Sequence, residues 1–136
     1  MKEVFYTVTG VFGSAFTYFM GGSDALVVVL SVFLAVDWLM GIVVAMVFKN
    51  STKTKSGGLN STVGFKGLCR KFFILMLVGV AHQLDTIMGV QVLRGGVIVA
   101  FISNETISII ENAGLMGITI PKVLKEAIDI LNEREV

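Results

Sequence analysis

Residues 101–112 read FISNETISIIEN, an apolar segment that also carries carboxylates and carboxamides. On a helix with 100° per residue, its strongly polar residues fall within an arc of about 120°. These residues are Asn104, Glu105, Ser108, Glu111 and Asn112. Such groups can carry protons or ions, line a water-filled lumen, or hydrogen-bond to other helices. Their alignment predicts one polar face on an otherwise apolar helix.

Asp37 is a second acid in apolar surroundings, near the middle of the run 25–48. A central acid costs about 2.5–3.5 kcal/mol on the membrane-insertion scale. Both Asp37 and Glu105 lie about 16 Å along the helix from an end, too far for a short side chain to reach the polar surface. Three interpretations remain open for these groups. They could hydrogen-bond between helices of one bundle, line a lumen made by several copies, or form a proton or ion path through a single bundle.

The sequence offers no enzyme chemistry. His82 and Asp85 lie one helical turn apart but have no nucleophile at a workable spacing, and no cluster of His, Cys, Asp and Glu has the spacing of a metal site. The lysine-rich segment 49–71 lacks interleaved aromatic residues, and its glycines do not lead into the Gly-Lys-Ser/Thr of a phosphate-binding loop. We therefore predict no enzymatic activity, no cofactor, no metal and no nucleic-acid partner.

The composition is that of a membrane protein. Of the 136 residues, 54% are hydrophobic and 15% are charged, with a mean hydropathy of +0.84. Soluble domains carry about 25% charged residues, so this chain has too little polar surface to cover a water-soluble globule. We predict an integral membrane protein whose first partner is the lipid bilayer.

Four apolar segments are long enough to cross the hydrocarbon core, which takes about 20 helical residues. They cover about 3–20, 25–48, 71–89 and 95–113. The first contains Gly10, Gly13 and Ser14 and could instead lie on the membrane surface, which would leave three. The predicted fold is an all-α integral membrane helical bundle with about four transmembrane helices.

The chain is expected to divide into a transmembrane helical domain, 1–115, and a C-terminal helix, 116–136. Pro121 suits the first turn of a helix, and Leu124, Ala127 and Ile128 then recur at helical spacing. This pattern predicts an amphipathic cytoplasmic helix. It would lie on the membrane surface or pack on a neighbouring subunit.

The basic residues indicate an orientation. Segment 49–71 contains no acid, and its cations are expected to hold the loop 49–70 in the cytoplasm by the positive-inside rule. These topology-setting residues are Lys49, Lys53, Lys55, Lys66, Arg70 and Lys71. With four spans, both termini of a multi-pass protein would then be cytoplasmic.

Small residues mark two helix faces that could pack closely. Gly41 and Ala45 lie four positions apart after Asp37, and Gly96 and Ala100 do the same in the last predicted span. This spacing lets membrane helices approach each other. We expect these faces to support helix packing, including packing between copies in a homo-oligomer.

Three sequence blocks resemble the toxin secretion/phage lysis holin family, the bacteriophage holins. They are DWLMGIVVA at 37–45, STVGFKGLCRKFFILMLVGVAHQLD at 61–85 and NETISIIENAGLMGITIPKVLKEAI at 104–128. The resemblance implies a small protein that accumulates and oligomerises in the bacterial cytoplasmic membrane. It would then form a lesion or pore, through which an endolysin reaches the cell wall during phage lysis or a toxin is secreted. No direct contact with the endolysin or toxin is implied.

Two other classes remain open beside the holin. The chain could be a small ion or proton channel, or a transporter subunit, that uses Asp37 and Glu105 for conduction. It could also be an antiholin-type regulator. On the leading holin hypothesis, the polar arc of 104–112 faces a shared lumen or holds neighbouring copies together.

Overall fold

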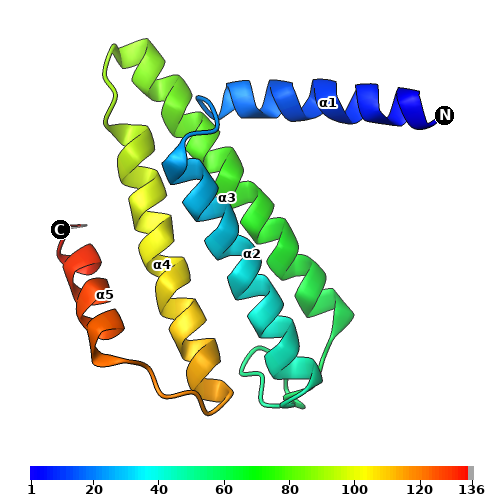
Figure 1. Cartoon of the computed structure of the whole chain (residues 1–136), viewed down its shortest axis with the longest axis vertical. Coiled ribbons are helices and arrows are strands. Elements are labelled where there is room, and N and C mark those ends of the chain that lie inside the picture. Colours follow the sequence, from blue (N-terminus) through cyan, green and yellow to red (C-terminus); the bar gives the residue numbers. More distant parts are fainter. Residues whose placement is uncertain (135–136) are drawn as a thin grey trace.

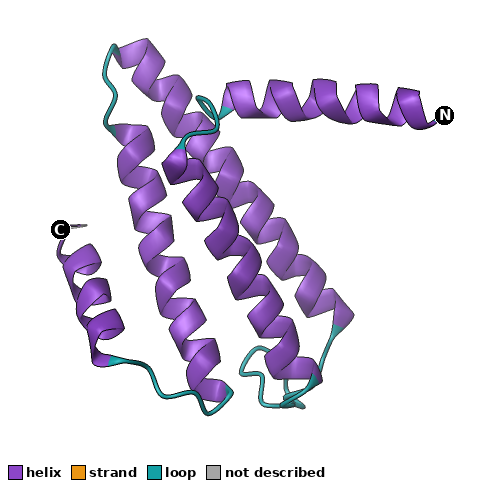
Figure 2. Ribbon diagram, viewed as in Figure 1, coloured by secondary structure: helices purple, strands orange, loops and turns teal. Residues whose placement is uncertain are grey.

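The computed structural model describes residues 1–134, which form five α-helices and, within that range, no strand. The helices are α1 (Lys2–Phe19), α2 (Ala25–Met46), α3 (Ser61–Met88), α4 (Leu93–Leu115) and α5 (Lys122–Arg134). Figure 2 shows short loops between α1 and α2 and between α3 and α4, and longer connections before α3 and α5. The predicted all-helical class is confirmed.

Helices α2, α3 and α4 run side by side as a bundle, and α2 packs most extensively on α4 (Figure 1). Their shared core consists of branched aliphatic side chains, because these fill the space between helices without leaving polar atoms to satisfy. The core residues in these three helices are Val27, Leu30, Leu34, Val78, Ile98 and Ile102. The outward surfaces of α2 and α3 are also apolar, with Val32, Leu39 and Phe73 each more than half exposed. An apolar exterior around an apolar core is what a bilayer requires.

Of the described helices, α2 and α4 are long and apolar enough to cross a membrane. The α3 helix packs against both of them, more extensively on α4, and its N-terminal half carries the cations Lys66, Arg70 and Lys71. By length and composition, the structure thus contains two membrane-crossing candidates among the described residues, whereas about four transmembrane helices were expected from the sequence.

The first predicted span is helical, but α1 does not join the bundle. It lies across the end of the bundle where α3 and α4 are connected, and none of its residues is buried (Figure 1). It is attached through Phe16 and Phe19, which pack at the edge of the core, and Phe16 stacks on Phe72 of α3 with ring centroids 5.8 Å apart. This crosswise arrangement agrees with the surface-lying alternative rather than with a fourth span alongside the others.

The third helix begins well before the expected start of its span. Asn60 accepts hydrogen bonds from the backbone N–H groups of Thr62 and Val63, so it caps a helix that starts at Ser61. The helix ends at Gly89, whose φ of 67° lies in the left-handed region that glycine adopts readily. The expected loop 49–70 is therefore shorter, and Lys66 and Arg70 lie on the first turns of α3.

The C-terminal segment forms α5 from Lys122, and this helix folds back beside α4 of the same chain (Figure 1). Ile128 is its buried contact among the side chains that the structure describes. Its expected positions, on the membrane surface or on a neighbouring subunit, stay predictions.

Candidate functional site

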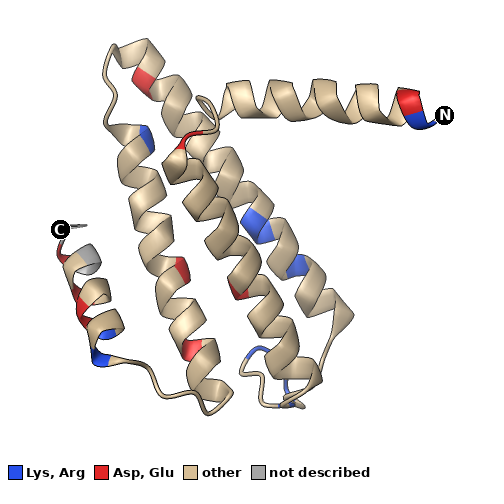
Figure 3. Cartoon of the chain, viewed as in Figure 1, with Lys and Arg blue, Asp and Glu red and all other residues tan. Residues whose placement is uncertain are grey.

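Three charged residues from three helices meet inside the bundle. The Lys71 ammonium group of α3 donates to Asp37 Oδ2 of α2 at 2.6 Å and to Glu105 Oε2 of α4 at 2.7 Å. The side chains are only 14%, 4% and 9% exposed, respectively. Figure 3 shows the corresponding charge pattern, with basic positions on α3 and acidic positions on α2 and α4. One cation therefore joins all three helices of the bundle.

Two neutral side chains of α4 complete the arrangement around Asp37. The Ser108 hydroxyl donates to Asp37 Oδ1 at 2.6 Å, and the Asn112 amide donates to the same oxygen at 2.9 Å. Ser108 and Asn112 follow Glu105 by three and seven residues, so all three project from one side of α4. We call Asp37, Lys71, Glu105, Ser108 and Asn112 the ion cluster.

The ion cluster satisfies its own polar groups. Among the described residues, no buried side-chain nitrogen or oxygen lacks a hydrogen-bond partner. With both acids ionised the cluster would carry a formal charge of −1, because two carboxylates share one ammonium. Removing one partner of a buried pair leaves an uncompensated charge and costs about 3–5 kcal/mol. The cluster therefore fixes how α2, α3 and α4 pack within one protomer.

The predicted polar arc of α4 divides into two parts. Glu105, Ser108 and Asn112 turn into the bundle, whereas Asn104 and Glu111 are exposed on its surface. Asn104 stands near the middle of α4, and the structure gives its side chain no hydrogen bond within the described chain. All five residues of the arc lie on α4, and a single protomer covers only one edge of it.

The two predicted small-residue faces differ in how far they are buried. Ala45 is buried, whereas Gly41 borders a pocket in which a Cβ atom would lie 3.9 Å from Lys53 Nζ. Gly96 is exposed and a Cβ atom there would contact nothing, while Ala100 is half-buried. The face at Gly96 and Ala100 is thus open at Gly96 and partly covered at Ala100.

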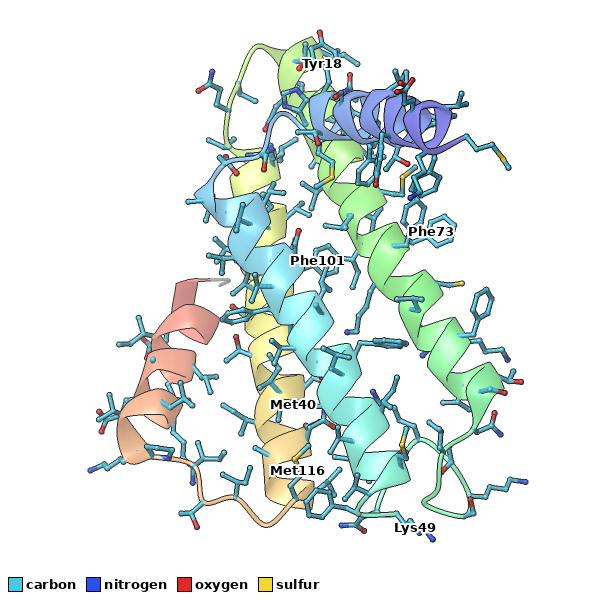
Figure 4. All side chains as sticks on the ribbon, turned by 45° about the vertical axis from the view of Figure 1, so that its right-hand side comes forward. Tyr18, Met40, Lys49, Phe73, Phe101 and Met116 are labelled. Atoms are coloured by element: carbon cyan, nitrogen blue, oxygen red, sulfur yellow. The ribbon has the colours of Figure 1, made fainter. Side chains whose placement is uncertain are left out.

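The predicted topology-setting residues are split between loop and helix. Lys49, Lys53 and Lys55 lie in the loop between α2 and α3, and Figure 4 shows Lys49 at the end of the bundle opposite Tyr18. Lys66 and Arg70 are exposed on α3, and Lys71 is drawn into the ion cluster. The role of Lys71 was missed because the sequence groups it with a run of other cations. Two acids at the middle of apolar helices were the signal that a buried cation had to be found.

Arg94 fixes the opposite end of the bundle. Its guanidinium donates to Asp24 Oδ2 at 2.6 Å and to the carbonyl oxygens of Met20 and Gly22 at 2.6 and 3.1 Å. The hydrogen bonds from Arg94 hold the pKa of the Asp24 carboxyl below its ordinary range. The Asp85 carboxylate accepts from the backbone N–H groups of Leu93 and Arg94, both at 2.9 Å, and so caps α4. We call the Arg94–Asp24 contact and the adjoining turn 20–24 the latch.

The structure also locates the residue types that could bind a metal or act as a base. Within residues 1–134, no three His, Cys, Asp or Glu side chains come together in a way that could hold a metal ion. His82, the one candidate base, packs beside the glycine turn of the latch, where a Cβ atom on Gly21 would lie 2.6 Å from the His82 ring.

Comparison with known proteins assigns the family. An uncharacterized protein of Listeria innocua is 40% identical over 124 residues, which cover 90% of this chain and 83% of that protein. An uncharacterized protein of Clostridium perfringens is 34% identical over 125 residues, covering 90% of this chain and 89% of that protein. A probable holin of Bacillus phage phi105 is 31% identical over 97 residues, covering 71% of this chain and 66% of the phage protein. No solved structure matches the chain. The sequence model of the bacteriophage holin family matches residues 14–133, and the chain belongs to this family.

Proposed function

We propose that this membrane protein acts as a holin. It accumulates in the cytoplasmic membrane of a bacterial host, self-associates, and opens a lesion that releases an endolysin during phage lysis. Family membership and the apolar helices α2 and α4 support this class. The observation that carries the self-association step is the exposed amide of Asn104, in the middle of a helix that is apolar enough to cross a membrane.

Asn104 belongs to a surface that suits contact between copies. Gly96, Ala100, Asn104 and Glu111 recur at spacings of four, four and seven residues, so they form one line along α4. We call this line the outer stripe. An unsatisfied amide in hydrocarbon costs several kcal/mol, whereas an amide can hydrogen-bond to its counterpart on another helix. Small residues beside it allow that helix to come close.

The ion cluster and the outer stripe then have separate roles. The ion cluster holds α2, α3 and α4 together inside each copy, because its polar groups are already paired there. The outer stripe is the surface that gains from a neighbour. Association therefore becomes favourable as the copy number in the membrane rises, and the protomer itself can stay folded throughout.

The crosswise position of α1 favours three spans over four. Its polar residues Thr9, Ser14 and Thr17 border an open pocket beside His82, and Phe16 and Phe19 face the bundle core. We propose that α1 lies in the membrane interface at the end opposite the basic loop. The N-terminus is then external, and the loop between α2 and α3 is cytoplasmic by the positive-inside rule.

Cysteine labelling tests this topology. Cys69 is the only cysteine, so a Cys69→Ser chain provides a clean background. In protoplasts, an impermeant maleimide should label Lys2→Cys at once and Lys55→Cys only after the membrane is opened. Protection of both positions would favour four spans instead.

Inducible expression tests the function. Production of the chain in a bacterium that also makes a cytoplasmic endolysin should cause abrupt lysis, whereas either protein alone should not clear the culture. Asn104→Leu should insert normally but delay lysis, and Val32→Leu on the exposed surface of α2 is its matched control. Growth unaffected by full expression would instead identify an antiholin-type regulator.

A second candidate is ion or proton conduction through the ion cluster, in which three ionisable groups and the Ser108 hydroxyl are hydrogen-bonded inside one protomer. Reversible, ion-selective currents from the purified chain in liposomes would favour it. Escape of a folded enzyme from the same liposomes would favour the holin.

A further inference from the structure

A pocket of about 580 Å³ opens between α2 and α3 at the end of the bundle that carries the basic loop. We call it the basic pocket, because four cations from the α2–α3 loop and from α3 border it. They are Lys53 of the loop, Lys66 and Arg70 of the first turns of α3, and Lys71 of the ion cluster. Its size lies within the range of about 300–1,000 Å³ that is typical of small-molecule sites.

The charge of the basic pocket is not neutralised. Lys53, Lys66 and Arg70 form no ion pair with any residue that the structure describes. The one acid at the pocket wall, Glu105, is already paired with Lys71 at 2.7 Å. Lys53 reaches back from the loop to the α2 backbone, since a Cβ atom on Gly41 would lie 3.9 Å from its Nζ atom. These unpaired cations give the pocket a positive charge that suits the binding of an anion.

An apolar groove of about 620 Å³ continues along the same pair of helices. Its walls include Leu34 and Leu39 of α2 and Leu68, Phe72 and Phe73 of α3. The groove uses residues 31–39 of α2, whereas the basic pocket uses residues 38–45, so the groove lies farther from the loop end. Figure 4 shows Phe73 on α3 well away from Lys49 and the loop.

Trp38 and Lys71 border both spaces. The Trp38 indole bridges the helices, because its Nε1 atom donates to the Gly64 carbonyl oxygen of α3 at 3.0 Å. Gly67 lies beside the indole, and a Cβ atom there would make an ordinary van der Waals contact, 3.7 Å from Trp38 Cδ1. The pocket with the unpaired cations and the apolar groove thus meet at Trp38 and Lys71.

We propose that this α2–α3 seam binds one anionic phospholipid. The phosphate lies in the basic pocket near Lys53, Lys66 and Arg70, and an acyl chain lies in the apolar groove beyond Trp38. When the loop end lies at the membrane surface, the headgroup lies at that surface and the acyl chain lies deeper. This is the arrangement that a lipid has in its own leaflet. Basic pockets between membrane helices are known to select such headgroups. The proposal depends on the chain lying in a membrane, not on lesion formation.

Trp38 is the only tryptophan and provides the readout. The full chain is placed in phosphatidylcholine vesicles that contain the same small fraction of either brominated phosphatidylglycerol or brominated phosphatidylcholine. Bromine on the acyl chain quenches a nearby indole. We expect the anionic lipid to be preferred at Trp38 by at least about fivefold, the factor that one cation near an anionic headgroup contributes.

Matched variants separate a site from general attraction to the surface. Lys66→Gln with Arg70→Gln should abolish the preference, and Lys53→Gln alone should reduce it. Lys49→Gln with Lys55→Gln removes as much charge from outside both spaces and should retain the preference. Equal quenching by the two lipids, or equal loss in both double variants, would overturn the proposal. Circular dichroism and the Trp38 emission maximum confirm folding, and Lys53→Gln stays informative if the α3 variant misfolds.

Free phosphate is the competing ligand for the same cations. Adding inorganic phosphate should relieve quenching by the anionic lipid no more than sodium chloride of equal ionic strength does. Stronger relief by phosphate would show that the basic pocket holds a free anion rather than a lipid headgroup. Lysis assays are not part of this test, so its failure would leave the holin proposal standing.

Discussion

The ammonium group of Lys71 lies 2.7 Å from a carboxylate oxygen of Glu105, although the two residues are 34 positions apart in the sequence. Because the same ammonium also contacts Asp37 at 2.6 Å, one side chain connects α2, α3 and α4. Asp37 and Glu105 are the residues that cost most to place in apolar helices, and through this contact they define how those helices pack. The same contact leaves Asn104, on the next edge of α4, without a partner in the protomer.

Replacing Lys71 tests the structural role of the ion cluster. Lys71→Met should destabilise the protomer by about 3–5 kcal/mol, because two buried carboxylates then face each other without a cation. Denaturant unfolding of the purified chain in detergent micelles measures this loss. Lys66→Met, an exposed position on the same helix, is the control and should change little.

The same cluster predicts a rescue. Adding Asp37→Asn and Glu105→Gln to Lys71→Met removes all three charges while keeping similar shapes, so much of the lost stability should return. Additive losses from the three changes would show that the residues act independently and would contradict a shared cluster.

Gly79 should control how α1 is attached. A Cβ atom at Gly79 would overlap the ring of Phe19, so Gly79→Ala should push this ring out of its site on α3 and loosen α1. Gly64→Ala is the matched control in the same helix, since a Cβ atom there contacts nothing. Both changes improve helix propensity by about 1 kcal/mol. Limited proteolysis should therefore cleave the connection after α1 faster in Gly79→Ala only.

The latch predicts a specific pH dependence. Because hydrogen bonds from Arg94 lower the Asp24 pKa, the pair stabilises the fold fully above the unfolded pKa of about 3.9 and loses this effect as the pH falls through the lower folded pKa. Asp24→Asn should thus cost stability at pH 6–8 and converge with the native chain in strong acid. The cost should be about 1 kcal/mol or less, since the Asp24 side chain is 49% exposed.

Denaturant unfolding of the native chain and of Asp24→Asn across this pH range measures the difference in stability. Glu126→Gln is the control, because its pair with Lys122 is exposed and 3.8 Å long. A stability difference for Asp24→Asn that grows as the pH falls would contradict the latch.

Much of the fold could be predicted from residue patterns, because apolar runs of membrane length and glycine breaks are local signals. The polar arc of α4 was equally visible, since Asn104 and Glu105 share a helical face whatever surrounds them. Which edge of that arc turns inward could not be predicted. It depends on where Asp37 and Lys71 stand across the bundle, and a helical pattern carries no information about a neighbour 34 residues away.

The position of α1 could not be predicted from the sequence either. Its sequence suits either a span or a surface helix, and the outcome depends on the contacts of Phe16 and Phe19 with α3. Lys71 was grouped with loop cations such as Lys53, because composition and charge identify a basic segment but do not reveal where a helix within it begins.

Cysteine crosslinking in native membranes tests whether copies of the chain associate through the outer stripe of α4. In a Cys69→Ser background, Asn104→Cys on the outer stripe and Ser108→Cys in the ion cluster are one turn apart on α4 and differ in the surface they occupy. Mild oxidation should convert Asn104→Cys into disulfide-linked dimers and leave Ser108→Cys monomeric. Dimers through position 108 with none through position 104 would show that copies do not associate through the outer stripe.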